Sequence, residues 1–306
     1  MMRTKLRLKW TVPAIVLLLI AYLAFDYWVP GNSPRFSNQV AVLEYHHIDP
    51  EASDYTITPD AFKSHIDALQ TNGYHIISMK QFIDFMDGRG TVPPGAVLLT
   101  FDDGYESFYQ YAYPILKERG LTATNFLIVS AVGTRTEDGT AFMSWDQIEQ
   151  MKADGFGFYS HTYNSHDFVP GADGKSVNSL TNPIFLPSLN RMETAQEYAQ
   201  RVRADLTQAE QVLAEKLGTQ DKLLCLPHGR YDQTTLTQSE QAGIQYIFTG
   251  VDGLNLPGSK LINRINGGAA KVTADKLLDK LTDETRLLGK LKIALKNYVT
   301  SMRMDE

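Results

Sequence analysis

Hydrophobic and polar positions alternate along the chain with two different periods from residue 40 onward. Short, largely apolar runs such as Val40–Tyr45 read as strands, and the near-continuous apolar run Ala96–Phe101 is typical of a strand that is buried on both faces. Other segments place apolar residues three and four positions apart, as in Phe62, Ile66 and Leu69, and this spacing is typical of helices. Because the two kinds of segment follow one another in turn, the pattern predicts an α/β fold with a parallel sheet.

The pattern also gives approximate boundaries for these elements. We expect strands near 40–45, 75–77, 96–101, 124–129, 155–160, 223–226, 245–249 and 260–265. We expect helices after Thr58, through 82–86, and near 107–119, 144–154, 194–217 and 234–242. Residues 167–192 show no periodicity and are read as a long loop over one rim. So many strand–helix alternations favour a (β/α)7-type barrel, in which chemistry sits at the carboxyl ends of the strands.

The amino-terminal segment has a different character. Residues 1–9 hold four basic and no acidic side chains, and an uncharged apolar run from Trp10 to Phe25 follows them. We read 10–28 as a transmembrane signal-anchor, with 1–9 on the cytoplasmic side and the body outside, because a basic flank stays cytoplasmic. A cleaved signal peptide, which would leave a secreted protein, is the alternative. Residues 29–39 form a polar linker, and 40–281 form the barrel.

Charge and composition exclude several classes of protein. Lys and Arg number 29 and Asp and Glu 35, so that the net charge is −6; without residues 1–30 the counts are 25 and 34, a net charge of −9. An acidic body argues against nucleic-acid binding. The chain has no Gly-rich phosphate loop, so we expect no nucleotide cofactor. A single cysteine, Cys225, excludes an intramolecular disulfide framework, so any metal must be held by His and carboxylate.

Two adjacent carboxylates end the strand at 96–101. Asp102 and Asp103 are followed by Gly104, and neighbouring strand residues point to opposite faces, so we expect the two acids to have different roles. One could bind a metal while the other accepts a proton. The alternative is a solvated turn, for which Asp-Asp-Gly is ordinary.

Two histidines follow another predicted strand end. His161 stands at the end of the predicted strand near 155–160, and His166 lies five residues further on. This spacing cannot place both rings on one helix face. At a strand end and the loop after it the two imidazoles can converge. One carboxylate and two imidazoles form a site with open positions, which catalytic zinc and related divalent ions favour.

Together these motifs resemble those of the polysaccharide deacetylases, the NodB-homology carbohydrate esterases. The resemblance implies that Asp102 is the general base, and that Asp103, His161 and His166 hold one divalent metal ion, Zn²⁺ first and Co, Ni or Fe as alternatives. The five-residue histidine spacing and the strand that ends in Tyr45-His46 resemble the branch that deacetylates poly-β-1,6-N-acetyl-D-glucosamine of biofilms. In that branch the barrel is circularly permuted, and the residue that matches its general acid is His46 rather than His47.

A further family motif, Arg-x-Pro-Tyr-Gly, is only partly kept. The matching segment has Cys225 at the Arg position and His228 at the Tyr position. The resemblance gives the backbone N–H of His228 a share in binding the oxyanion. Arg264, at the end of the last predicted strand, is our candidate to brace Asp102 in place of the missing arginine.

The function implied is metal-dependent N-deacetylation of an extracellular N-acetylglucosamine polymer, with release of acetate. Alternatives are the same hydrolysis on peptidoglycan or chitin, and a catalytically silent glycan-binding protein. Tyr105 and Tyr163 lie nearest the motifs and are candidates to stack on sugar rings. Residues 282–306 form an amphipathic helix, whose apolar stripe we expect to pack on the barrel; lying on an anionic membrane is the alternative.

Overall fold

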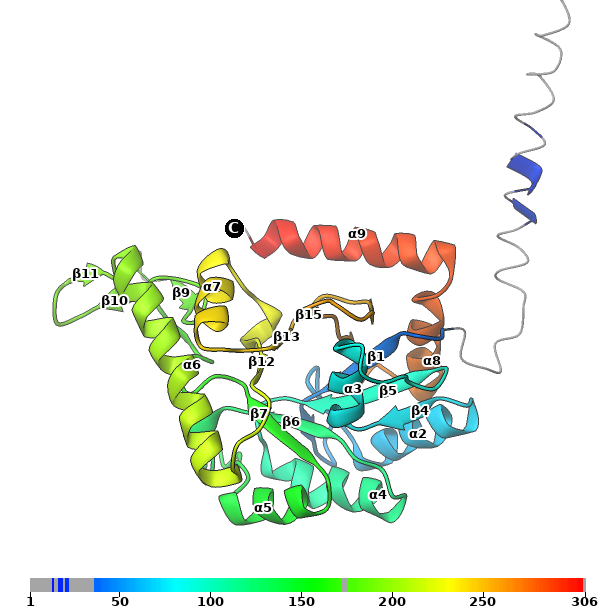
Figure 1. The fold of residues 1–306 in the computed structure, drawn as a ribbon, viewed down its shortest axis with the longest axis horizontal. Coiled ribbons are helices and arrows are strands. Elements are labelled where there is room, and N and C mark those ends of the chain that lie inside the picture. Colours follow the sequence, from blue (N-terminus) through cyan, green and yellow to red (C-terminus); the bar gives the residue numbers. More distant parts are fainter. Residues whose placement is uncertain (1–12, 14–15, 19, 22–35, 172–174, 305–306) are drawn as a thin grey trace, which may run out of the picture.

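The computed structural model describes residues 13, 16–18, 20–21, 36–171 and 175–304 (Figure 1). The predicted membrane segment 10–28 and the linker lie mostly outside these residues, so both stay predictions. Among the described residues, no helix combines the length and the apolar character needed to cross a bilayer.

The strands are short, and most belong to one sheet. In chain order they are β1 (Val40–Tyr45), β2 (His47–Ile48), β3 (Thr56–Ile57), β4 (His75–Ile77), β5 (Ala96–Phe101), β6 (Thr124–Leu127), β7 (Gly157–Ser160), β8 (Phe168–Pro170), β9 (Ser176–Asn178), β10 (Phe185–Leu186), β11 (Arg191–Met192), β12 (Leu223–Cys225), β13 (Tyr246–Phe248), β14 (Leu254–Asn255), β15 (Leu261–Ile262) and β16 (Ile265–Asn266).

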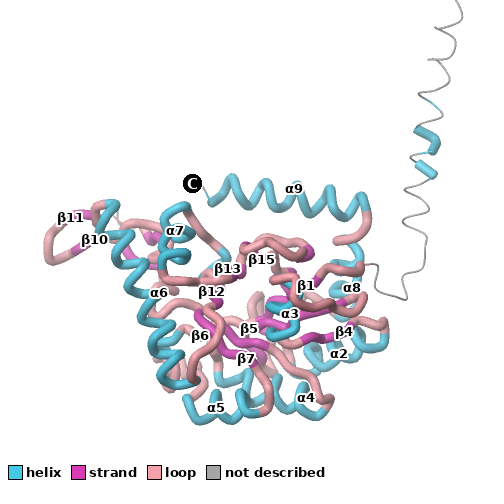
Figure 2. The backbone as a smooth tube through the Cα atoms, in the orientation of Figure 1, coloured by secondary structure: helices cyan, strands magenta, loops and turns pink. Residues whose placement is uncertain are grey.

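Helices follow most strands and surround the sheet (Figure 2). They are α2 (Pro59–Thr71), α3 (Met79–Met86), α4 (Tyr113–Glu118), α5 (Trp145–Ala153), α6 (Ala195–Leu217), α7 (Gln233–Gln241), α8 (Ala274–Asp283) and α9 (Leu287–Met304), with a π-helical turn at Phe108–Ala112 and 3₁₀ turns at Val129–Ala131 and Pro227–Gly229. Several helices begin where the sequence predicts. Ser144 caps α5 in a capping box with Gln147, because each side chain satisfies a backbone N–H of the other.

The main sheet is α/β and nearly closed into a barrel. Its strands follow the order β14-β1-β5-β6-β7-β12-β13-β15, and all neighbours are parallel except β14, which runs antiparallel to β1. The last segment closes the ring, because residues 261–262 pair with β13 and residues 265–266 pair with β1. The expectation of a parallel α/β barrel is confirmed to this extent.

Alternation along the strands fills the barrel with apolar side chains. Val40 and Val42 of β1, and Ala96 and Leu98 of β5, belong to the same buried cluster as Phe126, Cys225 and Phe248 from other strands. Helix α3 supplies five further members of that cluster, so it closes the amino-terminal end of the barrel. Toward the carboxyl end of the barrel, the inward-facing positions of β1 and β5 continue with polar residues, Glu44 and Asp102 respectively.

Residues 167–192 are more ordered than the sequence analysis expected. They form two short antiparallel hairpins, β8 with β9 and β10 with β11, beside the long helix α6 (Figure 1). The aperiodic composition gave no sign of them, because two- and three-residue strands carry no measurable period. The expected strand 260–265 is likewise divided in two at Arg264, where the chain passes from β13 to β1.

The expected packing of the carboxyl-terminal helix is wrong. Helix α9 exists, yet the six apolar residues of its stripe that the structure describes are 40–65% exposed. They are Leu287, Leu288, Leu291, Leu295, Tyr298 and Val299. The face that carries Asn297 lies toward the barrel instead, and Asn297 binds the backbone of Asp252.

Candidate active site

A cavity of about 710 Å³ opens at the carboxyl end of the barrel. Its volume lies within the range of about 300–1,000 Å³ that is usual for ligand sites. Polar side chains from most of the parallel strands line it: Glu44, His46, His47, Asp102, Asp103, Tyr105, His161, His166, His228, Asp252, Arg264, Asn266 and Lys296. The mouth of the barrel is therefore where the candidate chemistry gathers.

Asp103, His161 and His166 converge on one point of this cavity. Oδ1 of Asp103 lies 3.4 Å from Nε2 of His161 and 3.2 Å from Nε2 of His166. This buried oxygen nevertheless has no hydrogen-bond partner of suitable geometry. One donor atom from each residue fits within 4.8 Å of the others, so the group could hold a metal ion. An unpartnered carboxylate oxygen between two ring nitrogens suits a shared cation, because buried polar atoms otherwise find partners.

The backbone aims Asp103 into the cavity against the alternation of the strand. Asp103 adopts a left-handed conformation, with φ of 73°, immediately after β5 ends. Simple alternation would place Asp102 and Asp103 on opposite faces, and that expectation is wrong, since both carboxylates line the cavity. A left-handed non-glycine residue costs free energy, and such residues gather at functional sites.

Hydrogen bonds around the two histidines fix their orientation. Nδ1 of His161 donates to the backbone oxygen of Cys225 at 2.8 Å, because a carbonyl can only accept, and this leaves the lone pair of Nε2 directed at Asp103. Asp205 of α6 accepts the backbone N–H groups of Tyr163 and Asn164, at 3.0 and 2.8 Å, in the loop between the two histidines. Helix α6 thus holds this loop in place through two hydrogen bonds.

Asp102 is held by an arginine from the far end of the chain. Nη1 of Arg264 donates to both carboxylate oxygens of Asp102 at 2.8 Å, and Nη2 lies 3.0 Å from Glu44. Nε of Arg264 donates to the backbone oxygen of Thr249. Burial raises the pKa of Asp102, but Arg264 acting together with His161 and His46 more than offsets burial and leaves this pKa below its usual value. Asp102 is therefore ionised at neutral pH.

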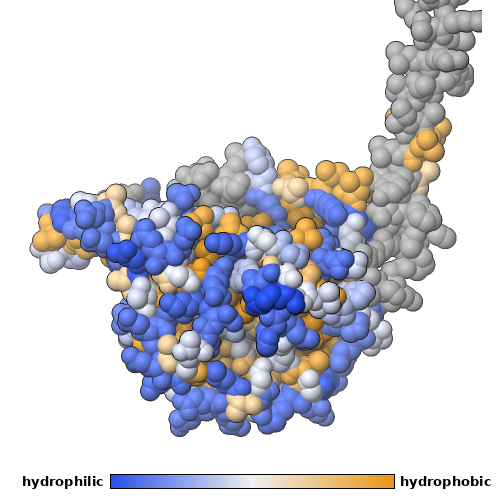
Figure 3. All heavy atoms as spheres, viewed as in Figure 1, coloured by the Kyte–Doolittle hydropathy of each residue, from blue (hydrophilic) through white to orange (hydrophobic). Residues whose placement is uncertain are grey.

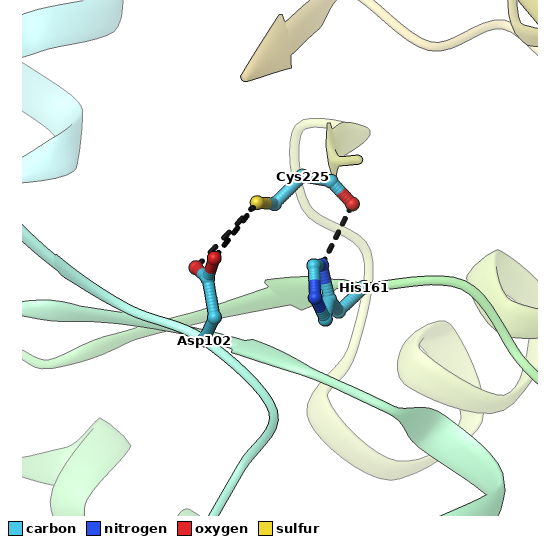
Figure 4. A group of neighbouring side chains, drawn as sticks. All are labelled: Asp102, His161 and Cys225. Atoms are coloured by element: carbon cyan, nitrogen blue, oxygen red, sulfur yellow. Dashed lines mark hydrogen bonds between the residues drawn. The ribbon is translucent and has the colours of Figure 1, made fainter. Parts of the chain in front are cut away.

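A second cluster, shown in Figure 4, joins Asp102, His161 and Cys225. The thiol of Cys225 lies 3.4 and 3.5 Å from the oxygens of Asp102 and donates to them. Burial raises the pKa of this thiol well above its ordinary value, so it stays protonated, whereas a metal ligand must be a thiolate. Arg264 already neutralises Asp102. The cluster consequently serves as a hydrogen-bonded support for Asp102 rather than as a metal site.

His46 directly follows β1 and lines the cavity close to Asp102. Its Nε2 is 3.8 Å from Oδ2 of Asp102 and 4.0 Å from Oε1 of Glu44. His47 also lines the cavity, which the sequence analysis did not expect, and its ring packs edge-on against Tyr105 with centroids 5.0 Å apart. Of the two histidines, only His46 approaches Asp102 within 4 Å among the described ion pairs.

Of the remaining candidate residues, some line the cavity and others do not. His228 lines it in a left-handed conformation, with φ of 56°, and its Nε2 donates to the backbone oxygen of His166. Tyr105 also lines it and stacks on Phe142. Tyr163 is not among the lining residues, and its side chain packs against the buried core. Of the two candidate tyrosines, only Tyr105 is therefore among the residues that line the cavity.

Sequence reasoning missed several residues of the cavity wall. Glu44 stands on β1, two residues before His46, and the i, i+2 spacing that places both on the inward face could have revealed it. Asp252 comes from a loop, Asn266 from the two-residue strand β16 and Lys296 from α9, where the sequence gives no signal of position.

Comparisons with known proteins point in one direction. The sequence model of the family described as polysaccharide deacetylase matches residues 89–247. The chain is 28% identical over 239 residues to poly-beta-1,6-N-acetyl-D-glucosamine N-deacetylase of Escherichia coli strain K12, covering 73% of this chain and 36% of that protein. The enzyme of the same name from Staphylococcus epidermidis is 26% identical over 228 residues, covering 69% of this chain and 72% of that one.

Solved structures agree with these relatives. A de-N-acetylase from Aggregatibacter actinomycetemcomitans superposes with a TM-score of 0.72 at 25% identity, covering 79% of this chain and 99% of that one. IcaB from Ammonifex degensii superposes with a TM-score of 0.67 at 27% identity, covering 80% and 97%. The chain thus spans the whole of these two solved domains, but little more than a third of the Escherichia coli relative.

Proposed function

This chain belongs to the polysaccharide deacetylase family, enzymes that act on the amide bonds of acetylated glycans, and we propose that it removes acetyl groups from poly-β-1,6-N-acetyl-D-glucosamine. The observation that carries the proposal is the grouping of a metal-type triad, an ionised Asp102 and a neighbouring His46 at one barrel mouth. The polymer is proposed because curated relatives that carry this activity in their names cover about 70% of the chain.

Asp103, His161 and His166 are the residues that would hold the divalent cation, for which Zn²⁺ is the ion we propose. A cation there supplies Lewis-acid polarisation of the acetamide carbonyl and of water. The donor set of one carboxylate and two imidazoles fits zinc and leaves positions open for substrate. The fixed Nδ1–H of His161 and the loop bonds to Asp205 keep the donors in place before the cation arrives.

Asp102 and His46 carry the proton transfers. Asp102 is ionised and buried, so it can accept a proton from the attacking water while Arg264 stabilises its charge. His46 lies on the open side of Asp102 and can donate a proton to the departing amine, since an amide nitrogen leaves poorly without one. The backbone N–H of His228 is the donor that we assign to the oxyanion. The products are acetate and a free glucosamine amine.

The order of elements along the chain supports a circularly permuted barrel. His46 follows the first barrel strand and Arg264 lies between β15 and β16 at the end of the barrel sequence, yet both residues contact Asp102. They meet because β16 pairs with β1 and so joins the two ends of the barrel. A general acid from the first strand and a brace from the last are what such a permutation would produce.

We also propose an extracytoplasmic location, with residues 10–28 as the membrane anchor. The support is the basic flank at 1–9 followed by the uncharged apolar run 10–25. An exopolysaccharide substrate would be met on that side of the membrane.

An acetate-release assay on three purified glycans tests the proposed substrate. The full chain, loaded with zinc, is incubated with poly-β-1,6-N-acetylglucosamine, peptidoglycan and chitin oligomers at equal acetyl concentration. We expect the highest kcat/KM on the β-1,6 polymer. Faster release from either of the other glycans would reassign the substrate, and binding to a glycan without release from any of them would favour a silent glycan-binding protein.

A further inference from the structure

One face of helix α9 is attached to the barrel, with hydrogen bonds from Asn297. Gly289, Ile293 and Asn297 are four residues apart and lie along one face of the helix; Gly289 is buried and the other two are half-buried. Asn297 accepts the N–H of Asp252 at 3.3 Å and donates to the backbone oxygen of the same residue at 3.0 Å. Lys296 adds an ion pair to the carboxylate of Asp252. These contacts fix which side of α9 faces away from the protein.

The opposite side of α9 is apolar and exposed. Leu288, Leu291, Leu295 and Val299 are 53%, 60%, 65% and 42% exposed. At about 100° per residue, Leu295 and Val299 lie roughly 160° around the helix from Asn297. Figure 3 shows apolar atoms gathered along the upper edge of the molecule, where α9 runs in Figure 1. A contiguous apolar face of this kind marks an interaction surface, since scattered single residues would not align.

The charge of α9 is opposite to that of the body. Residues 287–304 hold four basic side chains and no acidic one. When the four basic residues of 1–9 and the two terminal acids are also set aside, residues 10–286 keep 21 basic and 33 acidic side chains, a net charge of −12. Lys290 and Lys292 are exposed on α9. A strongly negative surface would attract this helix while it repelled the rest of the molecule.

We propose that the apolar face of α9 docks on an anionic lipid bilayer. Exposed leucines flanked by lysines on one helix are the pattern of a helix that lies in the membrane interface. Charge argues against a second copy of this chain as the occupant, because two basic helices would face each other. The apolar run 10–25 is expected to enter the same bilayer, although the docking of α9 does not depend on it.

Docking in this way would place the catalytic mouth beside the membrane. Lys296 of α9 lines the cavity and pairs with Asp252 on its wall. Because α9 would both dock on the bilayer and border the cavity, the mouth of a docked enzyme would lie next to the bilayer surface. A polymer that leaves the membrane would then meet the cavity close to its point of exit.

Tryptophan fluorescence in brominated vesicles tests the proposal on the full chain. The three native tryptophans are replaced by phenylalanine, and Leu295→Trp places a single reporter on the exposed face. In vesicles of brominated phosphatidylcholine with about a third phosphatidylglycerol we expect most of the reporter's fluorescence to be quenched. We expect much weaker quenching when the phosphatidylglycerol is left out, because the lysines of α9 then have no anionic lipid headgroups to pair with.

Two variants control the measurement. Leu256→Trp puts the reporter on another exposed leucine, in the loop that reaches α3 at the amino end of the barrel, and should not be quenched. Leu291→Glu, added to Leu295→Trp, should abolish quenching while acetate release from a soluble oligomer stays unchanged. Absence of quenching at residue 295 would overturn the proposal. A blue shift of the tryptophan emission that needs no lipid and grows with protein concentration would also overturn it, because this result would indicate that a second copy of the chain covers the helix.

Discussion

Arg264→Gln is the substitution that most sharply tests the support of Asp102, the proposed catalytic base. Arg264 is buried and binds both oxygens of Asp102 as well as Glu44, so its loss leaves two carboxylates without their cation. Because burial alone raises the pKa of Asp102, removing the charge that opposes it must move this pKa upward. The base form of Asp102 would then be lost at a higher pH than in the unaltered enzyme.

Two magnitudes follow from this geometry. An arginine beside an aspartate lowers its pKa by about 1–3 units, so the acid limb of the kcat/KM profile should move up by a similar amount. Activity then falls about tenfold for each pH unit below the new limb. Breaking a buried ion pair by removing one partner costs about 3–5 kcal/mol of unfolding free energy.

The assay combines acetate release between about pH 5 and 9 with urea unfolding. Arg264→Lys keeps the charge without the bidentate contact, so it should retain part of the normal pH profile. Arg191→Gln is the matched control, because Arg191 binds Glu197 through two nitrogens on the surface and should contribute less than about 1 kcal/mol. An unchanged acid limb and an unchanged unfolding midpoint in Arg264→Gln would refute the reasoning.

Two further predictions concern carboxylates of α6. Asp205→Ala leaves the N–H groups of Tyr163 and Asn164 without their acceptor, so zinc affinity should fall about 10- to 100-fold in a calorimetric titration; an unchanged affinity would show that the loop needs no support. Burial raises the pKa of Glu210 from 4.5 to about 7, so between these values the folded chain binds more protons than the unfolded chain and stability falls as pH rises. Glu210→Gln should therefore stabilise the protein by up to about 3 kcal/mol at alkaline pH and by little at acid pH in urea unfolding, and equal effects at both would contradict this assignment.

The strands and helices of the barrel could be predicted because their patterns are long enough to have a period. Ala96–Phe101 is fully buried as its near-continuous apolar run indicates, and α6 begins after Thr194 within a residue of the expected position. The hairpins within 167–192 and the antiparallel strand β14 could not be predicted, since two or three residues define no period and their pairing depends on distant partners.

The gathering of most candidate residues at one barrel mouth was predicted, and their geometry only in part. Strand ends brought Asp102 and His161 to one mouth, as the rule for parallel barrels requires. The direction of Asp103 depends on a left-handed backbone that no pattern encodes. The outward face of α9 could not be predicted either, because amphipathicity identifies an apolar stripe without saying whether protein or lipid covers it.

The most direct test of the central claim is a zinc titration of the metal-stripped full chain, with bound metal and acetate release measured on the same samples. Our account predicts that acetate release is absent without metal and reaches its plateau at one ion per chain. It also predicts that Asp103→Asn, folded by circular dichroism, neither binds the ion tightly nor releases acetate. Full acetate release from the stripped enzyme, or from Asp103→Asn without bound metal, would contradict the account.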